Sequence, residues 1–143
     1  LDIVQPARLY LGQKDYQQFL IISQLVKMMG LATAVVRCAI VREADGLAMS
    51  SRNVRLEGEN RLVATELSKT LFQIGKSKKD DLARTLSDAR NVLSNHPAIT
   101  LEYLEAADAQ TLQPVETINE NQELVVCVAA QIGGVRLIDN ILI

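Results

Sequence analysis

The residues from Gly12 to Gln18 have the types and spacing of a binding loop for a phosphate or a carboxylate. A glycine between a strand and a helix lets the backbone approach a ligand closely, and the first N–H groups of a helix attract anions. Lys14 adds a positive charge, and the amides of Gln17 and Gln18 can both donate and accept hydrogen bonds. The alternative is an ordinary loop in which Asp15 caps the helix and Lys14 is solvated.

A second polar cluster runs from Asp45 to Asn53 and contains Ser50, Ser51 and Arg52 in succession. Two adjacent hydroxyls can wrap a polyphosphate, and a guanidinium supplies a two-pronged fork for its oxygens. The alternative is a polar turn between domains, in which a serine caps the backbone nearby. One cluster precedes a predicted helix and the other follows a predicted strand, so we expect both to face the same cleft.

The residues around the first cluster predict a strand–helix–strand unit. A short strand at residues 9–11 ends at Gly12, and apolar residues then recur at helical spacing from residue 19 to residue 29. Asp15 and Gln18 predict a capping box at the start of this helix, and Gly30 predicts its end. Residues 33–41 are almost entirely apolar and rich in Val, which predicts a strand buried on both faces of a parallel sheet. The loop after Gly12 then lies at the carboxyl end of a strand, where open α/β sheets bind ligands.

The rest of the chain predicts a small α+β domain. Helices are expected at residues 59–74 and from an N-cap at Ser77 to residue 94, packed as an antiparallel pair. Strands are expected at residues 99–104, 123–131 and 135–141, and a hairpin turn at residues 133–134 joins the last two. The apolar stripes predicted to face the core are Leu62, Val63, Leu67 and Leu71 on the first helix, and Leu82, Leu86, Ala89, Val92 and Leu93 on the second. The layout is therefore the end of a parallel α/β domain, a polar hinge and a small α+β domain.

The composition excludes several classes of protein. The chain has 143 residues, of which 48% are hydrophobic and 22% charged, so it is not a disordered or low-complexity chain. A net charge of −2 and a low content of aromatic residues, with no Trp, argue against nucleic acid or an acidic membrane as a partner. No apolar segment reaches the roughly 18–20 uncharged residues that span a bilayer, and the opening residues form no secretory signal. We therefore expect a cytoplasmic protein, with Cys38 and Cys127 as buried thiols.

Three stretches of the chain, taken together, resemble the pantothenate synthetase (pantoate–β-alanine ligase) family. They are Leu11 to Gln18, Arg42 to Asn53, and Arg136 to Asn140, and their order and spacing match the family over essentially the whole chain. Within the second stretch, Met49 to Arg52 resembles the KMSKS-type loop of the nucleotidylyltransferase superfamily.

This resemblance implies an AMP-forming ligase that joins D-pantoate to β-alanine with ATP and Mg²⁺, through a pantoyl-adenylate, releasing AMP and pyrophosphate. Lys14 would be the catalytic residue, in contact with the nucleotide phosphates and the activated pantoyl group, and Gln18 would hydrogen-bond pantoate. The ATP-binding set implied by the resemblance places Gly12 against the ribose, Asp15 on the nucleotide side, the Val41 backbone against the adenine, Met49 near the base, and Ser50, Ser51 and Arg52 over the triphosphate.

The resemblance also implies that half of the site is missing. The paired-histidine motif of the family, its other pantoate glutamine and its Mg²⁺-side acid belong to the first half of a Rossmann-like domain, and the single histidine here, His96, lies in no such motif. We therefore expect a C-terminal portion that is inactive alone and has no metal ligands of its own. Residues 1–41 would end the Rossmann-like ATP- and pantoate-binding domain, and residues 42–143 would form the C-terminal α+β domain with the KMSKS-like loop. The full-length enzyme would be a homodimer. The alternative is a non-catalytic module that binds nucleotides or mediates oligomerisation.

Overall fold

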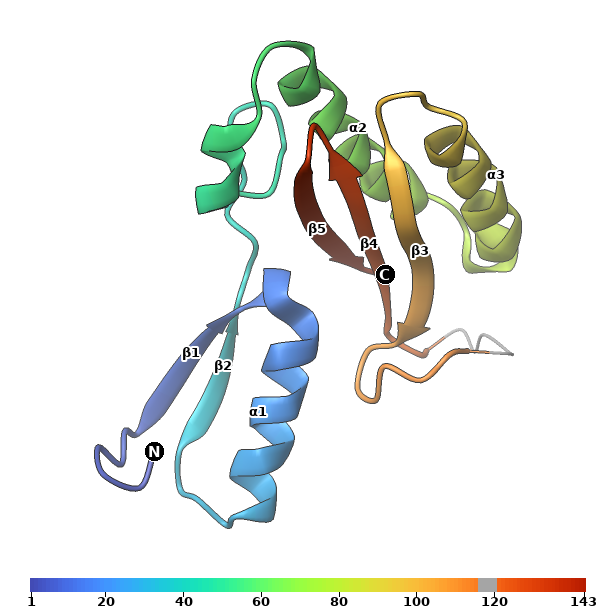
Figure 1. Cartoon of the computed structure of the whole chain (residues 1–143). Helices are drawn as coiled ribbons and strands as arrows, with labels where there is room; N and C mark the ends of the chain where they lie inside the picture. Colours follow the sequence, from blue (N-terminus) through green and yellow to red (C-terminus); the bar gives the residue numbers. More distant parts are fainter. Residues whose placement is uncertain (116–120) are drawn as a thin grey trace. The chain divides into compact units, whose positions relative to one another are not determined.

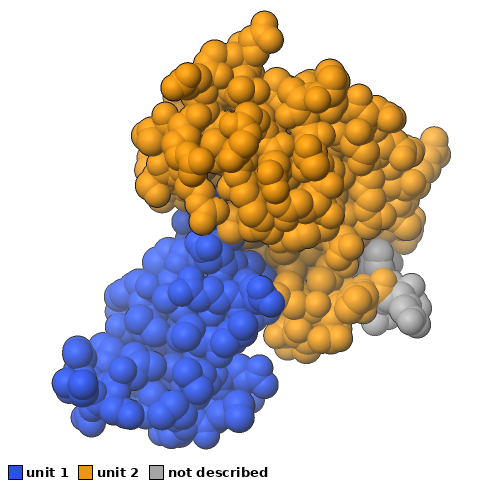
Figure 2. All heavy atoms as spheres, in the orientation of Figure 1, with its two compact units in different colours: residues 1–40 blue, residues 41–143 orange. Residues whose placement is uncertain are grey.

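A computed structural model describes residues 1–115 and 121–143 of the chain. The fold divides into two compact units, Leu1–Ile40 and Val41–Ile143, coloured separately in Figure 2. The first unit contains the Gly12 to Gln18 cluster, and the second contains the Asp45 to Asn53 cluster. Each unit is an independent arrangement of helices and strands.

The first unit is the predicted strand–helix–strand arrangement (Figure 1). Strand β1 (Arg8–Gly12) leads through a short 3-10 turn (Gln13–Asp15) into helix α1 (Tyr16–Met28), and strand β2 (Ala34–Cys38) follows. The two strands pair in parallel, with Arg8 opposite Ala34 and Gly12 opposite Cys38. The prediction of a parallel strand pair joined by a helix is confirmed.

The two ends of α1 differ in how well the sequence predicts them. Gly30 has φ +62°, and its N–H donates to the carbonyl of Lys27 at 3.2 Å while the N–H of Leu31 donates to that of Val26 at 3.1 Å. This pair of bonds is the Schellman ending that favours glycine, so the predicted stop is confirmed. Asp15 occupies the N-cap position but makes no side-chain capping bond, so the predicted capping box is wrong. Its backbone, at ψ 61°, continues from the 3-10 turn and lacks the extended conformation that aims a capping carboxylate.

Strand β2 is shorter and more exposed than predicted. It ends at Cys38, three residues before Val41, and its side chains are half-buried or exposed, including that of Cys38. Within the first unit, β2 pairs only with β1, and α1 packs against the pair. One helix cannot cover both faces of a sheet, so the prediction of a strand buried on both faces is wrong for this unit.

The second unit packs two helices against an antiparallel sheet (Figure 1). Helix α2 (Glu59–Ile74) and helix α3 (Leu82–Ser94) precede strands β3 (Thr100–Asp108), β4 (Leu124–Ile132) and β5 (Val135–Leu142), and β4 lies between the other two. The turn between β4 and β5 contains two glycines with positive φ, as a tight hairpin requires. The predicted helices, strands and hairpin are confirmed, with shifts of a few residues at their ends.

The start of the second helix differs from the prediction. A 3-10 turn (Lys79–Asp81) precedes α3, and Asp81 occupies its N-cap position. Ser77 lies before this turn, and its hydroxyl donates to the carbonyl of Ile74 at 2.7 Å. Ser77 therefore completes the end of α2 and does not cap α3.

The core of the second unit lies between α2, α3 and the sheet. Helix α2 contributes Ala64, Leu67, Leu71 and Ile74, and the central strand β4 is buried over most of its length. Leu62 was predicted to belong to this stripe, but its side chain is 70% exposed. Nine residues separate it from Leu71, a rotation that places the two on opposite sides of a helix with about 3.6 residues per turn. Val92 on α3 is exposed for the same kind of reason.

The contrast between Leu71 and Leu62 predicts unequal effects on stability. Leu71 is fully buried, so Leu71→Ala should lower the free energy of unfolding by about 2–5 kcal/mol through lost burial and a cavity. Leu62→Ala, the matched control, should change it by less than about 0.5 kcal/mol. Urea unfolding of the two variants, followed by circular dichroism, measures both effects. Equal losses would contradict the assignment of the buried face of α2.

Candidate functional site

The predicted phosphate-binding loop of the first unit follows β1 directly. Gly12 is the last residue of the strand, Lys14 and Asp15 lie in the 3-10 turn, and Gln18 lies in the first turn of α1. Lys14 is half-buried, whereas Gly12, Asp15 and Gln18 are exposed. The loop therefore presents a cation, a carboxylate and an amide at the carboxyl end of a parallel strand.

Gly12 has no structural need to be glycine within this chain. Its backbone has φ −70°, which any residue adopts. Among the residues that the structure describes, a Cβ atom built there would meet nothing within 4 Å. The space beside its Cα is therefore open to a molecule that approaches the backbone.

The start of α1 is fixed to β2 by aromatic and cationic side chains. Tyr16 is buried, and the guanidinium of Arg37 donates to its hydroxyl at 3.3 Å. The same guanidinium lies 6.0 Å from the centroid of the Tyr16 ring and 5.9 Å from that of Phe19. These contacts hold the first turn of α1 and the loop before it, and they were not predicted from the sequence.

The serine–arginine segment of the second unit forms the start of a 3-10 helix (Ser51–Arg55). The Ser50 hydroxyl oxygen accepts a hydrogen bond from the backbone N–H of Arg52 at 3.2 Å, so Ser50 caps this helix. Capping was the alternative role considered for a serine here, although the hydroxyl hydrogen can still be donated. Ser51 and Arg52 are exposed, and the Arg52 guanidinium lies 3.5 Å from the carbonyl oxygen of Arg136 on β5.

Val41 and Met49 are held together by the backbone. The N–H of Met49 donates to the carbonyl of Val41 at 2.9 Å, and Arg42 pairs with Ala48 in an antiparallel bridge. The side chains of Val41 and Met49 are 64% and 55% exposed. Residues 41–49 are thus a small hairpin with two exposed apolar side chains at its open end.

The tip of this hairpin is shaped by Asp45 and Gly46. Gly46 has φ +90°, in the left-handed region that favours glycine. The carboxylate of Asp45 accepts the N–H of Leu47 at 3.1 Å and pairs with Arg61 at 2.7 Å. The bond from the Leu47 N–H, followed by the pairing with Arg61, lowers the pKa of Asp45. Asp45 therefore keeps its charge, and its support of the turn, to a lower pH than an ordinary aspartate would.

Arg42 attaches the hairpin to the sheet. Its guanidinium makes two hydrogen bonds to the carboxylate of Asp139 on β5, at 2.7 and 3.0 Å, and lies 4.8 Å from the centroid of the Phe72 ring on α2. Asp139 is only 3% exposed. Neither residue was among the predicted site residues. The signal that could have found them is a single carboxylate within an apolar strand, because a buried acid requires a cationic or hydrogen-bonding partner.

A second group of polar contacts joins the hairpin to the 3-10 helix and to α2. The amide of the buried Asn53 donates to the carboxylate of Glu43 and, at 3.1 Å, to the carbonyl of Ala48. Arg61 on α2 pairs with Glu43 at 2.6 Å. Residues 41–53, hereafter the anchored loop, are thus attached to both α2 and β5, whereas the sequence suggested a polar hinge.

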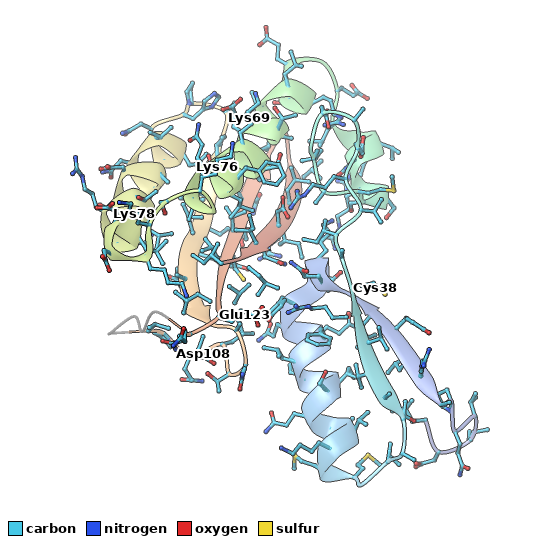
Figure 3. The ribbon with its side chains drawn as sticks, turned by 180° about the vertical axis from the view of Figure 1, so that it is seen from behind. Cys38, Lys69, Lys76, Lys78, Asp108 and Glu123 are labelled. Carbon is cyan, nitrogen blue, oxygen red and sulfur yellow. The ribbon has the colours of Figure 1, made fainter. Side chains whose placement is uncertain are left out.

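The remaining cations and thiols contribute little to these clusters. Lys69, Lys76 and Lys78 are spread along α2 and the connection to α3, and Cys38 lies at the end of β2 (Figure 3). His96 stabilises a turn, because its Nδ1 atom accepts the N–H of Ala98 at 3.2 Å. Cys127 is half-buried, and burial raises its pKa to about 11. The prediction of a buried thiol is therefore wrong for Cys38 and only partly met by Cys127.

Two features are absent from the described residues. Across residues 1–115 and 121–143, no three His, Cys, Asp or Glu side chains come together to hold a metal ion. Within the same residues, no helix combines the length and the apolar character needed to cross a bilayer.

Comparison with known proteins identifies the family. The sequence profile described as Pantoate-beta-alanine ligase matches residues 1–142. The chain is 42% identical to the pantothenate synthetase of Cytophaga hutchinsonii over 99% of its own length and 51% of the relative's. It is also 43% identical to a bifunctional pantoate ligase/cytidylate kinase of a Synechococcus strain, of which it covers 27%.

Solved structures agree with this result. The pantothenate synthetase of Thermus thermophilus matches 97% of this chain with a TM-score of 0.85 and 35% identity, over 50% of its own length. The pantoate-beta-alanine ligase of Francisella tularensis, described as complexed with Beta-gamma ATP and Beta-alanine, matches 99% of this chain with a TM-score of 0.64 and 32% identity, over 46% of its own length. The chain thus spans about half the length of most of these relatives. Because the family profile matches residues 1–142, the chain belongs to the pantoate–β-alanine ligase family.

Proposed function

We propose that this chain is the C-terminal portion of an AMP-forming ligase that condenses D-pantoate with β-alanine at the expense of ATP. The observation that carries the proposal is the family match over residues 1–142. The coverage of about half of most of these relatives supports the view that the other part of the site lies outside this chain. In this reading, residues 1–41 end a Rossmann-like domain that binds ATP and pantoate, and residues 42–143 form the C-terminal domain.

In the first step, a carboxylate oxygen of pantoate attacks the α-phosphorus of ATP, and pyrophosphate leaves with the electrons of the broken P–O bond. In the second, the amine of β-alanine attacks the acyl carbon of the resulting pantoyl-adenylate, loses a proton and expels AMP. Negative charge builds up on the phosphoryl oxygens during the first step. A positioned ammonium group lowers the energy of such a transition state, and we assign this role to Lys14.

The neighbours of Lys14 suit the remaining parts of the two substrates. The open space beside Gly12 allows the ribose to lie against the backbone. The exposed amide of Gln18, in the first turn of α1, has both a donor and an acceptor for the hydroxyl and carboxylate groups of pantoate. Asp15, next to Lys14, would face the nucleotide.

The anchored loop suits the nucleotide. Ser51 and Arg52 are exposed at the start of a 3-10 helix, and Ser50 retains a hydroxyl hydrogen to donate, so these three residues would bind the triphosphate. The exposed side chain of Met49, next to the backbone of Val41, would lie at the adenine. Mg²⁺ as a cofactor and a homodimeric assembly stay predictions from the family resemblance, and a cytoplasmic location stays a prediction from the sequence.

The first expected outcome concerns the isolated chain. The pure 143-residue protein, supplied with ATP, Mg²⁺, pantoate and β-alanine, should release AMP no faster than a blank without protein, because it lacks the paired-histidine motif. The complete gene product that carries this chain is the positive control. Steady turnover by the 143-residue protein would show that the motif is not required.

The second expected outcome separates Lys14 from Arg52 in the complete gene product. Lys14→Ala should lower the rate of adenylate formation by about 10²–10³, the usual effect of removing one group that stabilises transition-state charge. Its ATP Kd should change much less, because the interaction is strongest in the transition state. Arg52→Ala should weaken ATP binding itself, since this side chain would hold the triphosphate in both states.

Single-turnover adenylation and ATP titration measure the two effects. Lys78→Ala is a matched control, because Lys78 is exposed and lies outside both clusters. If the adenylation rate of Lys14→Ala stays within about threefold of that of the unmodified enzyme, the loss is far smaller than expected. Lys14 would then be a solvated loop residue, the alternative given by the sequence.

A further inference from the structure

We propose that Asp139 is a positioning residue for nucleotide binding, and that it acts through Arg42 to hold the anchored loop in the conformation that presents Ser50, Ser51 and Arg52. The proposal rests on the ATP-binding role proposed above for those three residues. Asp139 itself is buried on β5 and is not assigned any contact with a substrate.

The carboxylate of Asp139 is held in a single orientation. Asp139 lies opposite Val128 in the register of β4 and β5, and its Oδ1 atom accepts the backbone N–H of Asn140 at 2.8 Å. Both carboxylate oxygens also accept hydrogen bonds from Arg42, so the pair has the parallel geometry that suits guanidinium and carboxylate. The position of Arg42 is therefore determined by the sheet.

Arg42 in turn holds the hairpin in place. The Nη1 atom that bonds Asp139 also donates to the carbonyl of Gly46 at 3.0 Å, across the turn. The backbone of Arg42 pairs with that of Ala48. The guanidinium of Arg42 thus connects the sheet to the turn of the hairpin, and its backbone connects the two strands.

The hairpin then fixes the serine–arginine segment. The carbonyl of Ala48 accepts the side-chain amide of Asn53 at 3.1 Å, and the backbone N–H of Asn53 donates to the carbonyl of Ser50 at 3.0 Å. The links from Asp139 to Ser50 are thus an ion pair, the backbone bridge between Arg42 and Ala48, and the hydrogen bonds of Asn53. A loop ordered before ATP arrives loses less conformational entropy on binding, and this raises affinity.

If stability were its only effect, a buried ion pair would be an inefficient way to provide it. Well-packed apolar side chains of similar volume often stabilise a protein as much as a buried pair does, because charges lose hydration on burial. The guanidinium of Arg42 sets the distance and direction of the Gly46 carbonyl, which an apolar contact could not do. This favours a role in geometry over a role in stability.

The test compares variants of the complete gene product by ATP titration and by amide hydrogen exchange. Asp139→Asn should raise the ATP Kd by roughly tenfold, which corresponds to about 1.4 kcal/mol. The KM for β-alanine should stay within about twofold of the unmodified enzyme's value, a smaller change than that in the ATP Kd. The amide of Met49, which donates to Val41, should exchange faster. Arg42→Lys, which keeps the charge but loses the fork, should shift both readouts in the same direction and serves if Asp139→Asn does not fold.

Glu102→Gln is the matched control, because it breaks an ion pair between Glu102 and Arg136 that joins β3 to β5 at the surface. It should leave the ATP Kd and the exchange of Met49 unchanged. A double-mutant cycle adds a readout that simple destabilisation would not reproduce. In the Arg52→Ala background, Asp139→Asn should weaken ATP binding less than it does alone, because Arg52, one of the three residues that it positions, is gone.

The outcomes distinguish the two proposals. If Arg52→Ala weakens ATP binding while Asp139→Asn and Arg42→Lys leave both readouts unchanged, the positioning role is overturned and the ATP site stands. Additive losses in the double-mutant cycle would also overturn it. If Arg52→Ala leaves the ATP Kd unchanged, the nucleotide-binding role of the loop fails, and the positioning role falls with it.

Discussion

The ion pair between Arg42 and Asp139 is the interaction on which the geometry of the second unit's polar cluster depends. It joins residues 97 positions apart, at the start of the unit and on its last strand. A carboxylate as buried as Asp139 needs a partner that satisfies both of its oxygens, and Arg42 does so. The requirement of one buried charge thereby determines where the hairpin lies. The side chains of Ser51 and Arg52 remain exposed because other residues hold the loop.

Much of the fold was predictable because its signals are local. The bounds of α2, the glycine ending of α1 and the glycine hairpin between β4 and β5 each depend on residues within one or two turns of chain. The errors concern burial. The exposure of β2 depends on how many elements cover it, and that of Leu62 on which face of α2 meets the sheet. Neither can be read from a short stretch of sequence.

The candidate site also has one part that was predictable from the sequence and one part that was not. The positions of Gly12, Lys14 and Gln18 follow from a strand that ends where a helix begins, so the local pattern was sufficient. The serine–arginine segment was likewise recognised as a polar cluster from its composition. Its anchoring was not, since Arg42 and Asp139 have ordinary neighbours in sequence and acquire their roles only when β5 joins the sheet. Spacing identifies residues that can contact a ligand more readily than those that support them.

The unequal environments of the two cysteines make this chain suitable for site-directed spectroscopy without prior removal of a thiol. At neutral pH, Cys127 stays protonated because its pKa is raised to about 11, and it is half-buried within the sheet. Cys38 is exposed and lies two residues before the end of the first unit. Because thiolates are the species that react with maleimides and related reagents, a fluorophore or spin label would attach selectively at Cys38. Such a label would report on the junction between the two units while substrates bind.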